Sequence, residues 1–451
     1  MLQTPIGNSA YGDGSTDVLI ATTVHWAPTT RLALSLAEAG LRVAALAPAE
    51  HALHRMGALA EVRRCNPHSG FVSRVEKAIR ELSPALIIPG DDRAVRGLHL
   101  LYHRSIGGGA RAKRVAETIR RSLGAPAAFP VVAWKSRFTD FCTNEGLPIP
   151  DTVTLADPRE FQASRASAAA PQVLKLDGNW SGRGVSVVRS PREATAAFES
   201  LMAARGWPSA LRSAVEQLSL APLADRLRGR TPAISVQRYI AGTLANRAVF
   251  CTEGTVLAGI TVATVQVGRE TGPTTVARII DHPEIEELTR TIVRRLGLSG
   301  FIGVDLIIEE GTGKPWLLEL NPRPTQICHL AFGPETDMIG ALVQHLRGTP
   351  LPLVSRRAVI DGPIVALYPG EFWRDPLSPY LRAAYHDVPW HQPQFVAAYA
   401  QYVAPDPLSW LQVMARSRPF RLLRRRLTAV VEAEPVEPAP IAAPSETAGG
   451  N

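Results

Sequence analysis

The sequence predicts a mixed α/β (α+β) protein, in which a Rossmann-like domain with a parallel sheet comes first and a strand-rich region follows. Residues 17–23, 29–40 and 41–48 read in turn as a buried strand, a helix and a second strand, and such β-α-β units build parallel sheets. Residues 234–267 and 301–321 instead read as successive strands with short turns between them, which is typical of antiparallel sheet. We therefore expect two different kinds of sheet in one chain.

Composition restricts the class of protein and its partners. The chain has 451 residues, enough for about two to four domains. Its net charge of +8 suits polyanionic substrates such as nucleotides. Aromatic residues are not interleaved with the basic ones, so we expect no nucleic-acid partner. No apolar run approaches the ~20 residues that span a bilayer, and the first residues lack the features of a signal peptide, so we expect no membrane partner.

The four cysteines stand far apart, at positions 65, 142, 251 and 328. They form no CxxC pair and no pairing with histidine, so the sequence indicates neither a zinc site nor a disulfide framework. Reduced thiols are typical of the cytosol. We therefore expect a cytoplasmic protein.

Within the first domain, helices are expected over 69–83 and 111–124, and a strand over 85–92 ends in the turn Pro-Gly-Asp-Asp. Ligands in open α/β sheets bind beyond the carboxyl ends of the strands. Asp91 and Asp92 are therefore candidates for ligand contact, and simple turn formation is the alternative. No GxGxxG follows the first strand, which argues against a nicotinamide-binding fold.

A glycine-rich loop separates two further strands near residue 180. The strand "QVLKL" contains Lys175, and Gly178, Gly182 and Gly184 follow it before the strand "VSVVRS". Glycines let backbone N–H groups approach phosphate oxygens closely, and a lysine supplies a point charge. The loop is either a phosphate-binding flap or an ordinary flexible turn.

The strands 301–310 and 315–321 flank the turn "GTGK" and predict a hairpin. If the turn centres on Thr312, residues equally far from it pair, and Asp305 and Glu319 are each seven positions away. Their side chains then lie on one face, about 4.5–5.5 Å apart at the β-carbons, and Asn321 shares that face. Five residues are expected on the other face: Val304, Leu306, Ile308, Leu318 and Leu320.

Two facing carboxylates repel unless a cation lies between them. With the Asn321 amide oxygen they form a hard-oxygen site that suits Mg²⁺ or Mn²⁺. Arg323, just beyond the strand, could stabilise developing negative charge. The alternative is structural, with Glu319 paired to Arg323 at a strand end and Asn321 starting a turn.

Three segments, "GVDLIIEEGTGKPWLLELNPRP", "VLKLDGNWSGRGV" and "VQRYIAG", resemble the ATP-grasp superfamily, nearest to its carbamoyl-phosphate-synthase-like and biotin-carboxylase-like ligases. The resemblance implies the following organisation: a Rossmann-like pre-ATP-grasp domain at 1–125, an ATP-grasp domain at 130–350 (a part with the glycine-rich flap subdomain at 131–235 and a metal-site core at 236–350), an extension packed on the core at 351–430, and a disordered tail at 431–451.

The resemblance also implies roles for individual residues. The ATP-binding residues would be Lys135 and Lys175 at the phosphates, Gly182 and Gly184 in the flap, and Gln237, Tyr239 and Ile240 in the hinge segment whose backbone pairs with the adenine edge. The metal ligands would be Asp305, Glu319 and Asn321, and Arg323 would steady an acyl-phosphate or its attack.

The sequence departs from the family pattern near the hinge. Gln237 stands where glutamate is usual, and the segment up to Asn246 lacks the acid that often holds the ribose, so the nucleotide preference is left open. Asp305 is Gln or Glu in some relatives. Arg247 and Arg278 either bind the second substrate or lie on the surface, and the surface position is the more common one for arginine.

The C-terminal region offers one further candidate site. The residues His386, Asp387 and His391 could suggest a metal, but their spacing matches no ligand motif. We therefore expect an irregular docked loop there.

These observations predict an ATP- and Mg-dependent ligase. It would activate a small-molecule carboxylate as an acyl-phosphate, and an amine or another nucleophile such as a thiol would then attack it. The alternative is a non-catalytic ATP-binding regulator, and an NAD-dependent enzyme is a third, weaker hypothesis. The sequence specifies neither the two substrates nor the oligomeric state.

Overall fold

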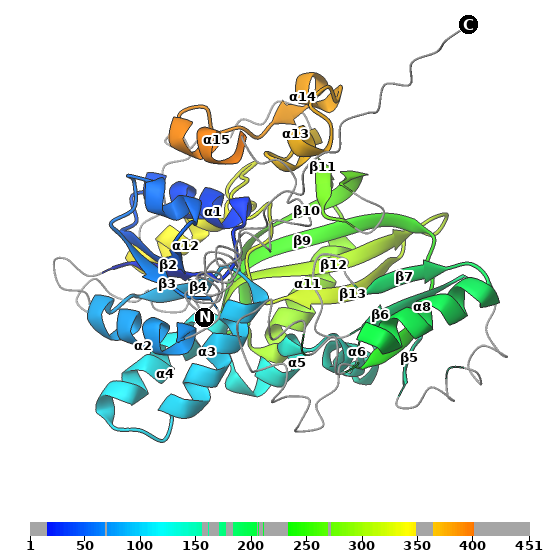
Figure 1. The fold of residues 1–451 in the computed structure, drawn as a ribbon, viewed down its shortest axis with the longest axis horizontal. Coiled ribbons are helices and arrows are strands. Elements are labelled where there is room, and N and C mark those ends of the chain that lie inside the picture. Colours follow the sequence, from blue (N-terminus) through cyan, green and yellow to red (C-terminus); the bar gives the residue numbers. More distant parts are fainter. Residues whose placement is uncertain are drawn as a thin grey trace, which may run out of the picture. The chain divides into compact units, whose positions relative to one another are not determined.

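The computed structural model describes residues 16–67, 70–155, 161, 171–176, 184–204, 206, 211, 233–268, 272–348 and 364–400. The contacts divide the chain into two units, Met1–Gln401 and Tyr402–Asn451, and every described residue belongs to the first unit. Helices and strands are both abundant in it, so the mixed α/β prediction is confirmed (Figure 1).

The first sheet is parallel, as predicted. Its strands are β1 (Val18–Ala21), β2 (Val43–Pro48), β3 (Glu61–Cys65) and β4 (Leu86–Pro89), in the order β3-β2-β1-β4. β1, β2 and β4 are buried at every position, which is characteristic of parallel strands that are covered on both faces. The edge strand β3 was not predicted, because its sequence EVRRC is mostly polar.

Helices cover both faces of this sheet. One face packs against α2 (Phe71–Leu82), α3 (Asp92–Ser105) and α4 (Ala110–Leu123). The other packs against α1 (Ala27–Glu38) and α12 (Met338–Arg347). We did not predict α3, because the Pro-Gly-Asp-Asp signal indicated only a turn; the turn is there, and its second aspartate begins the helix.

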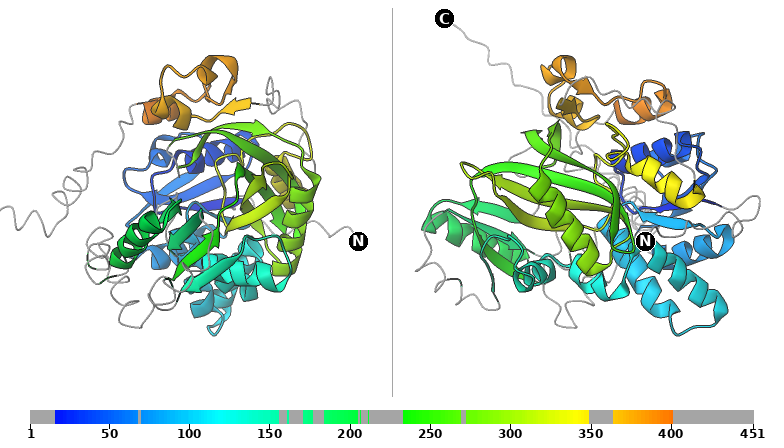
Figure 2. Two further views of the ribbon diagram at one scale, coloured as in Figure 1. Left: turned by 90° about the vertical axis from the view of Figure 1, so that its right-hand side faces the viewer. Right: turned by 180° about the vertical axis from the view of Figure 1, so that it is seen from behind.

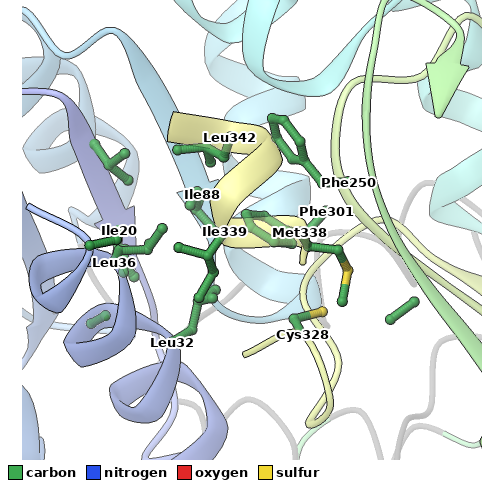
Figure 3. Packing of buried hydrophobic residues seen from close by; sticks show 14 of the residues in the cluster. Ile20, Leu32, Leu36, Ile88, Phe250, Phe301, Cys328, Met338, Ile339 and Leu342 are labelled. Carbon is green, nitrogen blue, oxygen red and sulfur yellow. The ribbon is translucent and has the colours of Figure 1, made fainter. Parts of the chain in front are cut away.

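Helix α12 links the parallel sheet to the larger sheet of the protein. Its residues Ile339 and Leu342 pack in one cluster with Ile20 of the first sheet and with Phe250 and Phe301 of the larger one (Figure 3). The two sheets therefore share a hydrophobic core, and such burial contributes about 25 cal/mol per Å² of apolar surface.

A small antiparallel sheet contains the lysine strand. Its strands are β5 (Thr152–Leu155), β6 (Gln172–Leu176), β7 (Val185–Val188) and β8 (Ile234–Arg238), in the order β5-β8-β6-β7. Helix α8 (Pro191–Ala204) covers one side of it through a separate hydrophobic cluster. This sheet is thus an independently packed element.

The large sheet has seven strands in the order β13-β12-β9-β10-β11-β14-β15. Their bounds are β9 (Gly242–Thr252), β10 (Thr255–Val267), β11 (Thr274–Ile279), β12 (Gly300–Glu309), β13 (Pro315–Asn321), β14 (Ile364–Ala366) and β15 (Tyr385–His386). All neighbouring strands are antiparallel except β14 and β15.

Helices α11 (Pro283–Leu296), α5 (Phe129–Ala133) and α6 (Lys135–Asn144) cover one face of the large sheet, and α11 lies across β9 and β10 (Figure 2). Pro283 occupies the first turn of α11, and Gly297, at φ 58°, ends the helix. The N-cap is His282, whose Nδ1 atom accepts the Ile285 N–H.

The segment 364–400 continues the large sheet and reaches the first domain. β14 pairs with β11, and α13 (Gly370–Arg374), α14 (Tyr380–Ala383) and α15 (Pro393–Ala400) follow. Phe395 of α15 packs with residues of α1 and of the 3₁₀ turn Ala52–Arg55. The predicted domain boundaries near 125, 130 and 350 stay a prediction. None of the described helices has the length and apolar character that crossing a membrane requires.

Candidate active site

The register of the β12–β13 hairpin is confirmed where it matters for the site. Asp305 lies opposite Glu319, and Gly303 lies opposite Asn321. Nearer the turn, Ile308 pairs with Pro315, so the turn centres between Gly311 and Thr312 rather than on Thr312. A bulge next to the Asp305–Glu319 pair absorbs the difference.

The bulge corrects one prediction about the core. Leu317, opposite Leu306, is fully buried in the cluster under α11. Leu318, which was expected there, is the extra residue of the bulge and is only half-buried. The extra residue puts Glu319 back on the same face as Asp305.

Amide groups hold the Asp305 carboxylate on both sides. Asn246 Nδ2 donates to Asp305 Oδ1 over 2.6 Å, and Asn321 Nδ2 donates to Oδ2 over 2.8 Å. The amide oxygen of Asn321 faces away and accepts from Arg323 Nη2 at 3.3 Å. In this arrangement Asn321 therefore turns its nitrogen, not its oxygen, toward the carboxylates.

Sequence reasoning missed the role of Asn246, which it treated only as a missing ribose-side acid. Asn246 on β9 pairs with Asp305 on β12, and its amide oxygen accepts from Thr325 Oγ1 at 3.2 Å. Gly303 permits this contact, because a β-carbon there would lie 2.2 Å from Thr325 Cγ2. Knowledge that 242–252 pairs with the first hairpin strand would have revealed the role.

The two carboxyl groups differ in their electrostatic surroundings. Lys135 Nζ lies 2.5 Å from Glu319 Oε2; burial opposes ionisation of Glu319, but Lys135 holds the pKa of Glu319 below its ordinary value. Burial raises the pKa of Asp305 to about 7, and the charge of Glu319 opposite adds to that effect. One carboxyl is thus held ionised and its neighbour resists ionisation, and a cation between them would relieve this conflict.

Lys175 approaches the same carboxylates from the small sheet. It lies on β6 between β7 and β8, paired with Val185 and Ser235. Burial lowers the pKa of Lys175 to about 8, and the nearby charge of Lys135 acts in the same direction. Gly184 directly precedes β7 and has φ at 71°, and Gly182 lies outside the described residues.

The predicted hinge joins the two antiparallel sheets. Gln237 is buried on β8, and its Nε2 donates to Thr152 Oγ1 at 2.9 Å. Tyr239 and Ile240 connect β8 to β9, which begins at Gly242. A β-carbon at Gly242 would lie 2.1 Å from the carbonyl oxygen of Ile308, so only glycine allows the hinge to approach β12 so closely.

Arg323 connects the hairpin to the first domain. Its Nε donates to Asp92 Oδ1 at 3.1 Å, and its guanidinium carbon lies 5.2 Å from the centre of the Trp26 ring. Asp91, by contrast, is a buried N-cap: its carboxylate accepts the N–H groups of Arg93 and Ala94. The structural alternative is therefore correct for Asp91, whereas Asp92 faces the site.

A narrow hollow of about 60 Å³ opens beside this ion pair. Asp92 lines it from α3, Trp134 and Lys135 line it from the start of α6, and Glu319 and Asn321 line it from β13. The hollow lies where the first domain meets the large sheet, and Asp92, a candidate for ligand contact, lines it.

The unassigned arginines do not join the site. Arg247 is 4% exposed, not on the surface as expected, and its Nη1 pairs with Glu286 Oε1 at 2.9 Å on the α11 side of the sheet. Arg278 is exposed, as expected.

The C-terminal residues His386, Asp387 and His391 do not form a common site either. His391 binds Glu38, while buried Asp387 accepts from His329 and Arg31. These contacts fit the docked loop that we expected, with no shared ligand geometry. Across the described residues, no group of three or more His, Cys, Asp or Glu side chains is arranged for a metal. A cation in this part of the chain would therefore need amide or phosphate oxygens besides the Asp305–Glu319 pair.

Two antiparallel sheets joined by a hinge, with an acidic hairpin on the larger one, define the class of fold. Residues 132–326 match the family model described as an ATP-grasp domain. The chain therefore carries an ATP-grasp domain, preceded by a parallel α/β domain. No curated protein matches the sequence.

Solved structures with the same fold are distant in sequence. L-amino acid ligase from Bacillus licheniformis has a TM-score of 0.53 at 16% identity, covering 77% of this chain and 78% of that one. N5-carboxyaminoimidazole synthetase from Staphylococcus aureus has a TM-score of 0.51 at 12% identity, covering 75% and 79%. Biotin carboxylase from Campylobacter jejuni, crystallised with β-γ-ATP, has a TM-score of 0.52 at 14% identity, covering 74% and 72%. At these identities the likeness establishes the fold.

Proposed function

We propose that this protein is an ATP- and Mg²⁺-dependent ligase that joins a small-molecule carboxylate to an amine or another nucleophile. The observation that carries the proposal is the facing pair Asp305–Glu319, with two lysines beside it. Opposed carboxylates are costly without a cation. Their combination with Lys135 from helix α6 and Lys175 from the small sheet suits a bound triphosphate.

The residues present fit a divalent cation. Asp305 and Glu319 would hold Mg²⁺ or Mn²⁺, and Asn321 would add its amide oxygen after the amide group rotates. All three donors are hard oxygen ligands, which magnesium prefers. A bound cation would neutralise charge on the ATP phosphates. Lys135, now paired with Glu319, would become available to a phosphate.

The nucleotide would lie between the two sheets. Lys135 and Lys175 would contact the phosphates, with Gly182 and Gly184 covering them from the flap. The hinge from Gln237 to Ile240, including Tyr239, would offer its backbone to the adenine edge. The lowered pKa of Lys175 supports this role, because phosphate charge would compensate for the burial of the ammonium group.

The reaction would proceed in two transfers. A substrate carboxylate oxygen attacks the γ-phosphorus of ATP, a new P–O bond forms, and the bond to the β-phosphate oxygen breaks to release ADP. The amine nitrogen then attacks the acyl carbon, phosphate leaves, and the amine proton passes to solvent. Arg323, fixed by Asp92, would stabilise negative charge on the acyl-phosphate. Positioning and charge neutralisation supply most of the catalysis in such transfers.

The fold relatives support this reaction class. The matched structures include an L-amino acid ligase, a carboxyaminoimidazole synthetase and a biotin carboxylase, and one biotin carboxylase domain was crystallised with magnesium ADP and bicarbonate. These proteins differ in their substrates, so the carboxylate and the nucleophile of this chain must be found by assay.

The test is a coupled ADP-release assay against a panel of small carboxylates and amines. We expect ADP release that needs Mg²⁺, a carboxylate and a nucleophile together. Tight Mg-nucleotide binding without release on any pair would instead favour the non-catalytic regulator, and absence of nucleotide binding would contradict both.

A further inference from the structure

A second, larger hollow lies between α2 and α4 on the first domain. Its volume is about 1050 Å³, and none of its lining residues belongs to the hairpin site. α2 and α4 cover the face of the parallel sheet opposite to α12. The groove is therefore separate from the candidate active site.

The groove is rich in cations. Five basic side chains line it: Lys77, Arg80, Arg111, Arg114 and Arg121. Three acidic side chains line it as well, but two of them already have a short ion pair to an arginine that does not line the groove. Arg63 lies 2.6 Å from Glu81, and Arg120 lies 2.8 Å from Glu117. The field inside the groove is therefore positive.

Three of the arginines share one face of α4, and none of them has a carboxylate within ion-pair distance among the described residues. Arg111, Arg114 and Arg121 follow the 3.6-residue helical repeat, with Thr118 between them. The Nε atom of Arg121 is buried without a hydrogen-bond partner. A buried donor left unpaired costs about 1–3 kcal/mol, and an anion in the groove would satisfy it once the Arg121 side chain turned toward the groove.

The position of these charges on the helix is also unfavourable. Arg111 and Arg114 lie in or next to the first turn of α4, where the structure has no acidic residue. The helix dipole is positive at that end, so each cation there costs about 0.3–1 kcal/mol. An anionic ligand would reverse this penalty.

From these features we propose that the α2–α4 groove binds a small, multiply charged phosphate compound. Arginine guanidinium groups bind phosphate oxygens through paired hydrogen bonds. The groove is large enough for a nucleotide-sized ligand, and Ile79 and Val115 give it an apolar floor. Because the site is outside the ATP-grasp domain, it would act as an effector site and does not depend on the proposed reaction.

The test is calorimetric titration of the full-length protein with inorganic tripolyphosphate, with and without saturating Mg²⁺ and a non-hydrolysable ATP analogue. We expect binding that persists in the presence of the analogue and weakens as salt is raised. The Arg111→Ala/Arg114→Ala variant should bind at least tenfold more weakly, with a melting temperature no lower than that of the wild type, because both side chains are exposed and their removal relieves the dipole penalty.

The matched control is Arg104→Ala/Lys113→Ala, which removes two exposed cations from the same domain but outside the groove. It should bind tripolyphosphate like the wild type. An equal loss in the control would mean that net charge alone is responsible, and displacement by the ATP analogue would assign the binding to the nucleotide site. Either result, or no binding to the wild type, would overturn the proposal; failure of the nucleotide site would leave this titration intact.

Discussion

The two faces of strand β9 differ in how buried charged groups are compensated. On one face, Asn246 supports the Asp305 carboxylate, which is opposed by a second carboxylate. On the other face, Arg247 pairs with Glu286 and donates to Thr261. The two side chains are neighbours in sequence, and each contacts a carboxylate, Asp305 or Glu286.

The difference is whether the charges are balanced within the chain. Arg247 and Glu286 neutralise each other, so the charges on that side of the sheet are balanced. On the opposite side Lys135 is in ion-pair contact with Glu319 only, and Lys175 acts from farther away. Burial and the facing Glu319 together raise the pKa of Asp305, so its carboxylate is not compensated by either lysine. An unbalanced cluster at the meeting point of two sheets indicates a missing cationic ligand, whereas a balanced pair indicates stability.

The largest expected effect is on the unbalanced side. Glu319→Gln keeps the shape of the side chain but removes a charge, and should lower turnover 10²-fold or more, equivalent to about 3–4 kcal/mol in the barrier. Lys175→Ala should act similarly. ADP release measures the effect, and the melting temperature serves as the folding control. Wild-type turnover in both variants would mean that the cluster is not catalytic.

Arg247→Leu should show the opposite pattern. It leaves Glu286 without its buried partner and should lower the free energy of unfolding by about 2–3 kcal/mol, while turnover at a permissive temperature changes little. Urea denaturation measures the loss. Arg278→Leu, which removes an exposed arginine from the same sheet, should change stability by less than about 0.5 kcal/mol. Equal losses in the two variants would refute a structural role for Arg247.

A buried histidine that stacks on an aromatic ring extends the comparison to pH. His99 stacks on Phe129 with ring centres 4.0 Å apart, and burial lowers its pKa to about 3 from 6.5. Because the unfolded chain binds a proton at His99 more readily than the folded protein does, the stability that neutral His99 contributes is fully present above pH 6.5. This stability is lost as the pH falls from 6.5 toward 3. Between pH 7 and 5 the wild type should lose about 2 kcal/mol on this account.

The measurement is chemical denaturation at the two pH values, with His99→Leu as the variant and His103→Leu as the exposed control on the same helix. The His99 variant should lack this part of the pH dependence, and the His103 variant should keep it. If all three proteins show the same slope, His99 is not the group responsible.

The smallest effect is expected at the ion pair between Asp92 and Arg323, which connects the first domain to the hairpin. Asp92→Asn should loosen Arg323 without removing it, and we expect about tenfold lower turnover, or about 1.4 kcal/mol, with little change in stability. Asp140→Asn, an exposed acid on α6, is the control. A fall in stability with turnover unchanged would make Asp92 a structural partner only.

Local features of the fold and site were predictable from sequence. Side-chain alternation and a glycine turn placed Asp305 opposite Glu319, even though a bulge was needed to achieve it. Asp92 was a candidate for ligand contact, but its pairing with Arg323 was not predicted, nor were the contributions of Asn246 and Trp26, because each depends on contacts between distant segments. The Pro-Gly-Asp-Asp sequence predicted only a turn, so the helix α3 that begins at Asp92 was not predicted.

The most direct test is Mn²⁺ binding, followed by electron paramagnetic resonance in the presence of a non-hydrolysable ATP analogue. Wild-type protein and the Arg247→Leu variant should take up the ion together with the analogue, while Asp305→Asn/Glu319→Gln should not. Undiminished uptake by the doubly substituted protein, with its fold intact, would contradict the account.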